Sequence, residues 1–577
     1  MNRIAAVIAG LSLAFVGTST TFAATINVPG DYGLIQTAID ASVNGDVIAI
    51  APGTYYENWL NPGGKAITIQ GTLNSNGSLA TSINGENIGS SVFVIQSEED
   101  NDTVIKDLII TGGSADFGGG IYCVDSDPTI IGCTITNNTS LYGGGGVWCG
   151  GVGNLAITDC RILNNTTGRD EPLIYGSGGG INCSGGNPVI TGCTISSNTA
   201  SFSGGGIYCY TNSYATINDC TIEDNSAGGQ DIPGYGGGVH CAAESDFEIT
   251  ATITDCMIRS NSATKRGGGI YSIGAISTIN DCTISNNTSH DGGGGLYVRD
   301  SDSNIIDCRL LGNSSLDGGG LYLWESNSSI QDCEILGNGA KAGGGIFCYI
   351  SNAVMTNCTI SDNVASDPNL LSHGGGIACY TYSDAIISNC IITNNTAGRM
   401  GGGIFCNSSD PTIANCVISG NTVYEGGGIA CLGSDPDIID CQIMDNLANK
   451  GGGINCASSS IPNISGSIIS DNSATSGGGI HHSEDGGISI LMETIVCGNA
   501  VGQIEGNWGD YGGNNIADEC PGCPGDATGD LFVDVDDLLY VLSVWNSDDA
   551  NADFDDDGLV DADDVLILLS HYGESCP

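Results

Sequence analysis

The sequence has few positively charged residues. Only 13 Lys and Arg stand against 65 Asp and Glu among 577 residues, which gives a formal net charge of −52. Proteins that bind nucleic acid need Lys and Arg to neutralise phosphates. The composition therefore excludes nucleic acid as a partner. It also opposes the binding of polyanionic polysaccharides, unless calcium bridges the like charges.

Long apolar runs are also scarce. The one run of note, Ile4–Gly17, follows Arg3 and precedes the small-residue segment Thr21–Ala23, which is the pattern of a secretory signal peptide. No other stretch reaches membrane-spanning length. We therefore expect residues 1–23 to be a signal peptide, the protein to be secreted or held at the cell surface, and the chain to have no transmembrane segment.

Glycine, in contrast, is abundant, and much of it lies in one repeated phrase, Gly-Gly-Gly followed by an aliphatic residue. The phrase occurs fourteen times between Gly118 and Gly477, at steps of 25 to 34 residues. A period of this length is typical of a stacked solenoid. Each unit continues with two short alternating segments of the type Ile121–Cys123 and Cys133–Ile135. Units this rich in Gly and β-branched residues predict strands rather than pairs of helices.

An Asn recurs three residues after the aliphatic position of the second segment in all fourteen units, from Asn138 to Asn499. A buried carboxamide is costly unless it is paired. Stacked Asn side chains can hydrogen bond from coil to coil, and Asn also tolerates the left-handed turn conformation. We therefore interpret the Asn column as a structural device at a turn, and not as a catalytic feature.

These units, together with the strand and turn segments Asp46–Ile50, Pro52–Tyr55 and Ala66–Gln70, resemble the pectin lyase-like superfamily over about residues 25–500. The resemblance implies an all-β fold, a right-handed parallel β-helix with about 14 regular coils plus N-terminal coils. The superfamily contains polysaccharide lyases, glycoside hydrolases, epimerases and adhesins. The resemblance therefore specifies the fold and leaves the reaction open.

The chain divides by composition into five segments. After the signal peptide, residues 24–117 are expected to form an N-terminal cap and the first coils, with a helical segment at Ile35–Ala41 covering the open end of the rod. Residues 118–500 are the regular repeats. Residues 501–525 are polar and Gly-rich and are predicted to be a linker, and residues 526–577 form an acidic C-terminal domain.

Twenty-two of the 26 cysteines occupy two repeat positions. Exported proteins commonly contain disulfides, and in this sequence a disulfide would join the two repeat cysteines of one coil. However, three consecutive coils carry Ser, Val or Leu at the first position while the second Cys remains. We favour free thiols packed as small apolar side chains over bridges. The other four cysteines lie outside these columns and are candidate disulfide partners at the end of the rod: Cys497, Cys520, Cys523 and Cys576.

The C-terminal domain carries two copies of a twelve-residue pattern in which oxygen-bearing side chains recur at the spacing of a calcium loop, each followed by an apolar helix pattern. Two such loops resemble a type I dockerin domain. The resemblance implies Ca2+ as a cofactor and a cohesin-like protein as a partner. Leu531 stands at the sixth position of the first loop, where Gly suits the backbone, so the first loop is expected to bind more weakly. The predicted ligands are Asp526, Thr528, Asp530, Asp534 and Asp537 in the first loop and Asp553, Asp555, Asp557, Asp561 and Asp564 in the second.

Alternation places the residue after the first aliphatic position, and the residue two further on, on the outer face of the rod. In four consecutive coils these positions are mostly aromatic, which predicts a continuous exposed strip on which sugar rings can stack. The alternative is a ladder that only stabilises strand pairing. The predicted carbohydrate-binding residues are Tyr271, Tyr297, Tyr322, Trp324, Phe347 and Tyr349.

No residues match a catalytic motif, so the catalytic residues are unknown. Glycoside hydrolysis needs two carboxylates roughly 5 to 10 Å apart, and Asp291, Asp317 and Glu325 lie near the aromatic strip. The lyase chemistry that the resemblance implies would use calcium and a basic residue, for which Arg266 and Arg299 are the candidates.

The sequence thus predicts a secreted β-helix protein for carbohydrate binding or scaffolding, at the cell surface or in an extracellular assembly, attached through the calcium-dependent dockerin-like domain. Its ligand would be a polysaccharide or a cell-surface glycan. The alternative is a polysaccharide-degrading enzyme, pectate lyase-like or a glycoside hydrolase, tethered by the same domain.

Overall fold

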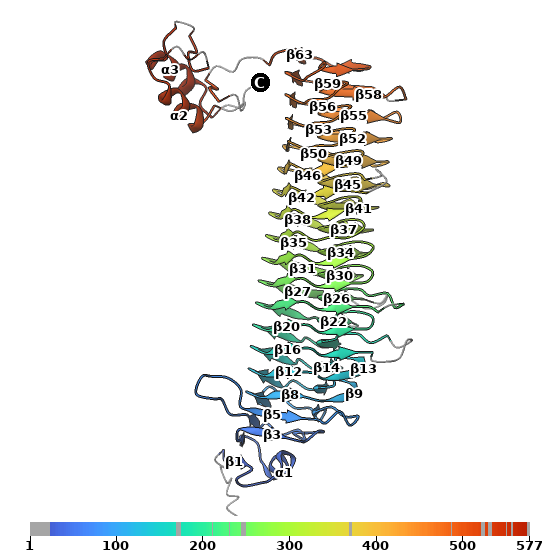
Figure 1. Cartoon of the computed structure of the whole chain (residues 1–577), viewed down its shortest axis with the longest axis vertical. Coiled ribbons are helices and arrows are strands. Elements are labelled where there is room, and N and C mark those ends of the chain that lie inside the picture. Colours follow the sequence, from blue (N-terminus) through green and yellow to red (C-terminus); the bar gives the residue numbers. More distant parts are fainter. Residues whose placement is uncertain are drawn as a thin grey trace, which may run out of the picture.

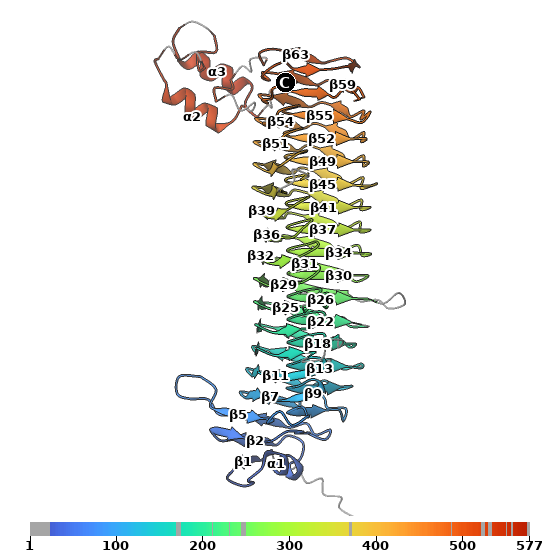
Figure 2. The ribbon, with the colours of Figure 1, turned by 45° about the vertical axis from the view of Figure 1, so that its right-hand side comes forward.

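The computed structural model describes residues 23–577 except 169–174, 211, 230, 244–249, 368–371, 486, 521–524, 529–532, 548, 550, 556–557 and 574–577. Within this range the chain winds into a long rod of about 18 turns (Figure 1). The turns remain stacked in the rotated view (Figure 2). The predicted parallel β-helix is therefore confirmed. The predicted signal peptide falls almost wholly on residues 1–22, outside the described residues.

One coil shows how the repeat folds. The left-handed conformation of Gly318 (φ 59°) turns the chain into β37 (Leu321–Trp324). The chain then passes through β38 (Ser329–Gln331) and β39 (Glu334–Leu336), which lie in two further sheets. A short strand, β40 (Gly339–Ala340), completes the coil before the next glycine triplet. Each strand pairs in parallel with its equivalents in the adjacent coils, so equivalent side chains stack along the rod.

The fourteen strands that follow the glycine triplets, together with one further strand at each end, form a 16-stranded parallel sheet, here called the triplet sheet. A second sheet of 19 strands begins with β1 (Thr25–Val28), and a third runs from β3 (Gly53–Tyr55) to β63 (Asn515–Ala517). The triplet sheet consists of β6 (Phe93–Ile95), β10 (Ile121–Val124), β14 (Val147–Gly150), β18 (Ile181–Ser184), β22 (Ile207–Tyr210), β26 (Val239–Ala242), β30 (Ile270–Ile273), β34 (Leu296–Arg299), β37, β41 (Ile346–Tyr349), β45 (Ile377–Tyr380), β49 (Ile404–Asn407), β52 (Ile429–Leu432), β55 (Ile454–Ala457), β58 (Ile480–His482) and β61 (Ile504–Glu505).

The inward-facing residues form one continuous apolar core of Ile, Leu, Val and Cys. The 22 cysteines of the two repeat columns are buried free thiols, which confirms that prediction. Several donate to backbone carbonyls, as Cys133 does to Ile131 O at 3.5 Å. Burial raises the pKa of the Cys123 thiol well above its ordinary value. The column cysteines pack in the core as small apolar side chains.

The Asn column forms a hydrogen-bonded ladder inside the turns, as predicted. Asn287 is fully buried, and its Nδ2 donates to Ile258 O (2.9 Å) and to Asn313 Oδ1 (3.1 Å). Its Oδ1 accepts from the backbone N and the Nδ2 of Asn261. The left-handed conformation that Asn tolerates is not adopted by the ladder Asn itself. The left-handed residue is the one before it, such as Asn286 (φ 53°).

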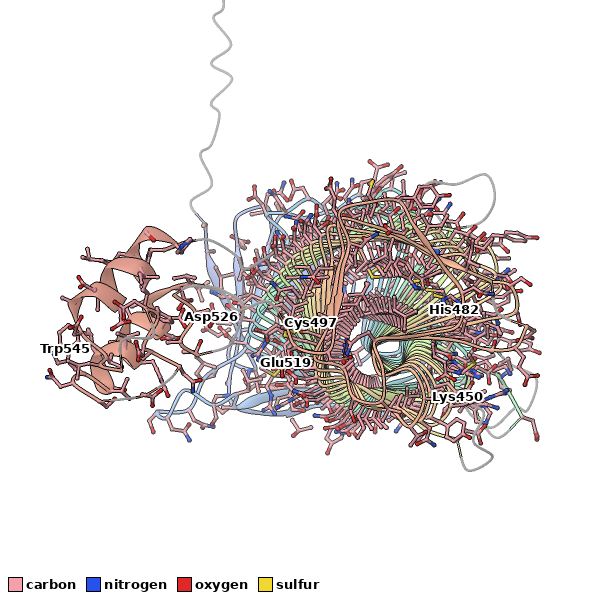
Figure 3. The ribbon with its side chains drawn as sticks, turned by 90° about the horizontal axis from the view of Figure 1, so that it is seen from above. Lys450, His482, Cys497, Glu519, Asp526 and Trp545 are labelled. Atoms are coloured by element: carbon pink, nitrogen blue, oxygen red, sulfur yellow. A yellow bond between two sulfur atoms is a disulfide. The ribbon has the colours of Figure 1, made fainter. Side chains whose placement is uncertain are left out.

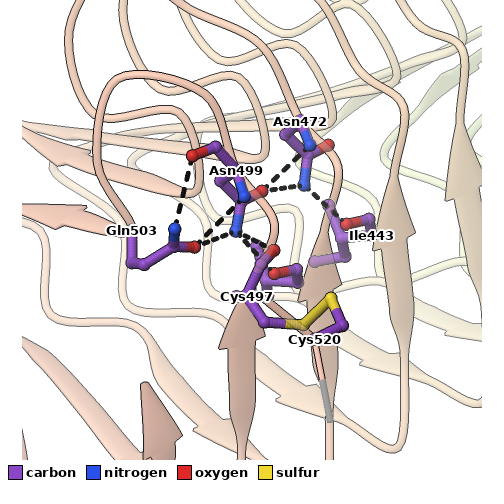
Figure 4. Close-up of a disulfide and its surroundings, with 7 residues drawn as sticks. Ile443, Asn472, Cys497, Asn499, Gln503 and Cys520 are labelled. Atoms are coloured by element: carbon purple, nitrogen blue, oxygen red, sulfur yellow. Dashed lines mark hydrogen bonds between the residues drawn. A yellow bond between two sulfur atoms is a disulfide. The ribbon is translucent and has the colours of Figure 1, made fainter. Parts of the chain in front are cut away.

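The ladder ends at Gln503, which takes the place of a further Asn. Its Oε1 accepts from Asn499 Nδ2 (2.8 Å), so the last carboxamide keeps a partner (Figure 4). Beside it, Cys497 and Cys520 form the disulfide that two of the candidate cysteines were predicted to make. Cys523 and Cys576 lie outside the described residues.

The predicted linker at 501–525 is wrong in its first part. Strands β61, β62 (Trp508–Asp510) and β63 lie within it and pair with the preceding coil. Ile504, Trp508 and Ile516 pack against the core of the rod. The polar, Gly-rich composition hid these strands because each is only two or three residues long and contributes one apolar side chain.

Small helical elements flank the rod. At its N-terminal end α1 (Ile35–Ala41) buries Ile35, Ala38 and Ile39 against the first coils, as expected for a cap. Beyond the C-terminal coils, α2 (Val535–Ser543) and α3 (Ala562–Ser570) follow the two acidic loops and share a separate core. In the view along the rod (Figure 3) these two helices lie beside the stacked coils.

The ladder yields a prediction for stability. Asn287→Ala removes four hydrogen bonds and leaves buried partners unsatisfied, which should lower the free energy of unfolding by at least about 2 kcal/mol. The neighbouring Thr288 is exposed, so Thr288→Ala is the matched control and should change little. Urea denaturation of the two variants compares them. Equal losses would show that the ladder does not carry this stability.

Candidate functional site

Two columns of side chains run side by side along the outside of the triplet sheet. The outer column is the second residue of each strand, as in Tyr297, Tyr322 and Phe347, which stack in register. The flanking column is the residue immediately before each glycine triplet, and its members are joined by parallel bridges from coil to coil. In the region of the predicted aromatic strip the flanking column consists of Tyr235, Arg266, Gly292, Asp317, Ala342, His373 and Met400.

The aromatic strip exists, but most of it is not exposed. The ring centroids of Tyr271 and Tyr297 are 5.1 Å apart, those of Tyr297 and Tyr322 are 4.7 Å apart, and those of Tyr322 and Phe347 are 4.8 Å apart. All four side chains are at most 9% exposed. The prediction of a solvent-facing strip is therefore wrong for these four residues, because the flanking column and the rings of the adjacent coils cover them. Their role in binding carbohydrate stays a prediction.

The other two predicted residues, Trp324 and Tyr349, are half-buried and meet edge to face at 5.6 Å. Arg266 and Arg299 place their guanidinium groups over the Trp324 ring, at 5.1 and 4.6 Å from its centroid. A guanidinium within about 6 Å of an aromatic centroid is attracted to the face of the ring. This part of the strip is consequently partly accessible and carries two guanidinium groups.

A hollow interrupts the flanking column at Gly292. A Cβ at this position would lie 2.8 Å from Tyr322 Cδ2 and 3.3 Å from Tyr297 Cε2, so Gly292 lets the two phenol rings pack against its backbone beside the hollow. The hollow has a volume of about 260 Å³. Its lining combines two carboxylates, one guanidinium and two phenol rings: Arg266, Asp291, Gly292, Tyr297, Leu316, Asp317 and Tyr322.

The pKa values of the two carboxyl groups in the hollow are shifted in opposite directions. Burial raises the pKa of Asp317 to about 6, with Asp291 adding to the rise and Lys341 opposing it. Burial also acts to raise the pKa of Asp291, but Lys265 at 2.6 Å and His290 at 2.7 Å outweigh it, and the net pKa is lowered. Near neutral pH the hollow thus holds one carboxyl group able to carry a proton and one that stays ionised, the usual sign of paired acid and base roles.

Tyr297 supplies a further polar group. Its hydroxyl is buried and has no hydrogen-bond partner among the described residues. The guanidinium of Arg266 lies 5.2 Å from the centroid of its ring. Burial raises the pKa of Tyr297 above its ordinary value, so the phenol is neutral and can donate. An unsatisfied buried donor that lines an open hollow is suited to a ligand oxygen.

The structure brings together some of the residues suggested by the sequence and separates others. Arg266, Asp291 and Asp317 meet in the hollow. Glu325 instead accepts from Trp324 Nε1 at 3.0 Å, and Arg299 pairs with Asp300 at 3.1 Å. Sequence reasoning named Arg266 and Asp317 but missed Gly292 and did not recognise that the three residues belong to one column. The sequence contained a signal for this column, because its members all stand immediately before a glycine triplet and also face outward.

The side chains of the C-terminal loops offer the oxygen ligands that a calcium site needs. Carboxylate oxygens of Asp553, Asp555 and Asp564 lie within 4.8 Å of one another, and calcium prefers six to eight oxygen ligands. Asp564 is buried, and its oxygens accept from the backbone N of Phe554 (2.6 Å) and of Asp561 (2.7 Å). These bonds draw the start of the loop onto the first turn of α3.

The first loop repeats this arrangement around α2. Asp537 is buried and accepts from Thr528 N (2.9 Å) and Asp534 N (2.8 Å). Asp534 and Asp561 are the N-caps of the two helices. Asp526 also lies among the described residues, whereas the predicted ligands Asp530 and Asp557 lie outside them. The residues present therefore fit a pair of calcium loops, and binding itself remains a prediction.

Asp317 yields a pH-dependent prediction. Its folded-state pKa, about 6, exceeds the value of 3.8 expected when unfolded, so the folded state holds this proton more tightly. Its ionisation therefore destabilises the fold as the pH rises from 4 to 7, by at most about 3 kcal/mol. Asp317→Asn should be more stable than the wild type at pH 7.5, and the difference should shrink towards pH 4.

Urea denaturation at both pH values measures the effect. Asp291→Asn is the control, and its effect on stability should have the opposite sign because the pKa of Asp291 is lowered. The stability that this carboxylate contributes is present at neutral pH and is lost as the pH falls, so its removal should cost stability at pH 7.5. A pH-independent Asp317→Asn effect would contradict the assigned environment.

Solved structures similar to this chain include pectate lyase Pel9A (13% identity, TM-score 0.31, covering 54% of this chain and 78% of that chain). They also include the A-module of mannuronan C-5 epimerase AlgE6 from Azotobacter vinelandii (14%, 0.21, 85% and 95%). A third is PfbA, a surface adhesin of Streptococcus pneumoniae (13%, 0.22, 73% and 87%).

Among curated proteins no sequence matches significantly. In the described part of the chain, no helix has the length and apolar character needed to cross a membrane. A family model described as a right handed beta helix region matches residues 71–262, 237–366 and 368–495, well over half of the sequence. The chain therefore belongs to the right-handed β-helix family.

Proposed function

We propose that this is a secreted or cell-surface protein that binds an extracellular polysaccharide in the hollow at Gly292 and is attached through its calcium-binding, dockerin-like domain. The observation that carries the proposal is the buried Tyr297 hydroxyl, which has no hydrogen-bond partner among the described residues and whose side chain lines the hollow with Asp317 and Arg266. Sugar hydroxyls both donate and accept, so one sugar can satisfy all three groups.

The size and walls of the hollow support a sugar residue as its occupant. At about 260 Å³ it lies below the usual range of drug-sized pockets, about 300–1,000 Å³, and suits one ring of a longer chain. The edge of the buried Tyr322 ring forms one apolar wall, and Trp324 lies next to it in the same strand. The aromatic stack thus contributes rigid walls, whereas the sequence predicted a flat stacking platform.

The charge around the hollow differs from that of the rest of the rod. Six of the 13 Lys and Arg residues fall between positions 259 and 341, although the chain carries a net charge of −52. Nine Asp and Glu accompany these six residues in the same stretch, so its net charge is −3, and these coils are less acidic than the rest of the rod without being positive. The six residues are Arg259, Lys265, Arg266, Arg299, Arg309 and Lys341.

Binding can be tested with the full-length protein against a panel of neutral and uronate polysaccharides, by affinity electrophoresis and calorimetry. Arg266→Ala removes the guanidinium, and Gly292→Ala fills the hollow, so each should weaken binding at least tenfold. Arg309 lies on β36 (Arg309–Leu311) in the third sheet and pairs with Glu334 at 2.7 Å. Arg309→Ala is therefore the matched control. Unchanged affinity in both site variants would refute the proposed site.

Glycan cleavage is the second candidate function, favoured by the opposite pKa shifts of Asp317 and Asp291. In this proposal Asp317 is the general acid, and Asp291 is the ionised partner. The same incubations are assayed for new reducing ends and for unsaturated-uronate absorbance. Product formation that Asp317→Asn abolishes, with binding retained, would identify an enzyme. Binding without products would leave carbohydrate binding or scaffolding.

The calcium proposal concerns the C-terminal loops. Asp553, Asp555 and Asp564, with the equivalent first-loop residues, would hold the ions, and bound calcium would neutralise the clustered carboxylates and order both loops. A cohesin-like protein is the proposed partner of the loaded domain. This part of the proposal is supported by the duplicated spacing and by the helix that follows each loop.

Calorimetric titration of the chelator-treated full chain should detect two calcium sites. Asp564→Asn should weaken one site at least tenfold, because it removes a buried carboxylate charge. Asp563 is exposed and adjacent, so Asp563→Asn should bind as the wild type does. Equal affinity in both variants would contradict the assigned ligands.

A further inference from the structure

A second, larger hollow lies at the N-terminal end of the rod, outside the site described above. It has a volume of about 560 Å³ and opens between the first coils, beside β9 (Ser114–Phe117) and β13 (Thr139–Gly143). This part of the rod is drawn in blue in Figure 1. We call it the N-terminal cleft, and its lining includes Trp59, Gln96, Asp116, Phe117, Tyr122 and Ser140.

Aromatic side chains at this cleft are accessible, in contrast to the covered rings of the outer column near Tyr297. Trp59 is 56% exposed and Phe117 is 38% exposed. Phe117 lies 5.4 Å from the ring of Tyr142 and 5.4 Å from that of Trp148, and Trp148 stacks on Tyr122 at 4.9 Å. The contacts hold Phe117 and Tyr122 in fixed orientations while their outer faces border the cleft. Exposed rings held in this way form a platform that is ready for a flat ligand face.

Trp59 has an unusual backbone conformation. Its φ of 56° is in the left-handed region, which is unfavourable for a bulky side chain. The neighbouring structure enforces it, because Trp59 N donates to Ser91 O (2.9 Å), and the next residue, Leu60, is buried and bridges to Phe93. Strained residues that their surroundings hold in place are concentrated at ligand sites. An exposed Trp in this conformation at the rim of a cleft is therefore consistent with a binding role.

The remaining lining is mostly polar and nearly uncharged, with Val94, Ala115 and Leu141 as its apolar members. Ser90, Ser91, Ser114, Thr139 and Ser140 provide hydroxyl groups, and Gln96 provides an amide. The Ser140 hydroxyl is buried without a hydrogen-bond partner among the described residues. Asp116 is the one charged side chain among the described lining residues, and it is exposed. Such a surface offers hydrogen bonds to neutral hydroxyls and repels carboxylates.

We propose that the N-terminal cleft binds a neutral oligosaccharide, whose rings stack on Trp59 and Phe117 and whose hydroxyl groups bond to the Ser and Thr side chains. The polar lining disfavours a purely apolar ligand, and Asp116 together with the acidic rod disfavours a uronate. The cleft lies six coils, or roughly 30 Å, from the hollow at Gly292. This inference is independent of the function proposed for that hollow.

The test uses the full-length protein and calorimetry with cellohexaose, mannohexaose, xylohexaose and laminarihexaose, with oligogalacturonate as the charged probe. We expect at least one neutral hexasaccharide to bind. Trp59→Ala and Phe117→Ala should each weaken that binding at least tenfold, with circular dichroism unchanged. Tyr214 is 44% exposed and does not line the cleft, so Tyr214→Ala is the matched control and should bind as the wild type does.

Two further variants keep the test decisive. Trp59→Phe retains a ring and should keep part of the affinity, even if Trp59→Ala disturbs the local fold. Asp116→Lys should leave neutral binding within a few-fold and add measurable binding of oligogalacturonate. The proposal is overturned if no neutral hexasaccharide binds, or if binding is unaffected by the Trp59 and Phe117 variants. If binding of the neutral hexasaccharide is lost in Arg266→Ala but kept in Trp59→Ala, the proposal is overturned as well. That result would instead support the site at Gly292.

Discussion

The Asn ladder is the interaction on which the rest of the structure depends. Each carboxamide bonds to the coil before it and the coil after it, as Asn313 does through Ile284 O at 2.8 Å and Asn338 Oδ1 at 3.1 Å. Because a ladder position leaves no room for slippage, every coil is held in one register. The glycine triplets then start each strand at the same place, and equivalent side chains stack both inside and outside the rod.

This register explains why the surface side chains form columns along the rod, and why a hollow can form where one column lacks a side chain. Inside, stacked Cys and Ile side chains close the core. Outside, the outer and flanking columns cover each other wherever both carry a side chain. Where the flanking residue is Gly292, the rings of Tyr297 and Tyr322 pack close to the backbone of that column, and Arg266 and Asp317 from the adjacent coils line the hollow. A single small residue in a regular array thereby creates a polar hollow above a buried aromatic stack.

The sequence was sufficient to predict what repeats. The coil, the buried thiols, the Asn ladder and the two loop–helix units all follow from residues that recur at fixed spacing, and the helical spacing of Ile35–Ala41 predicted the N-terminal cap. What could not be predicted depends on residues that do not recur. The flanking column changes from Arg266 to Gly292 to Asp317 without a pattern, so the burial of Tyr297 was missed. Gln503 closes the ladder in place of Asn, and the left-handed Trp59 lies in an irregular early coil.

The central claim is that a polysaccharide is recognised at the gap in the flanking column. Hydrogen–deuterium exchange of the full-length protein, with and without a saturating polysaccharide ligand, tests it most directly. The account predicts that slowed exchange is concentrated in peptides that contain Arg266, Gly292 and Asp317, three neighbours in space that are 25 or 26 residues apart in sequence. Slowed exchange in one contiguous segment away from these residues, or no change along the rod despite binding, would contradict it.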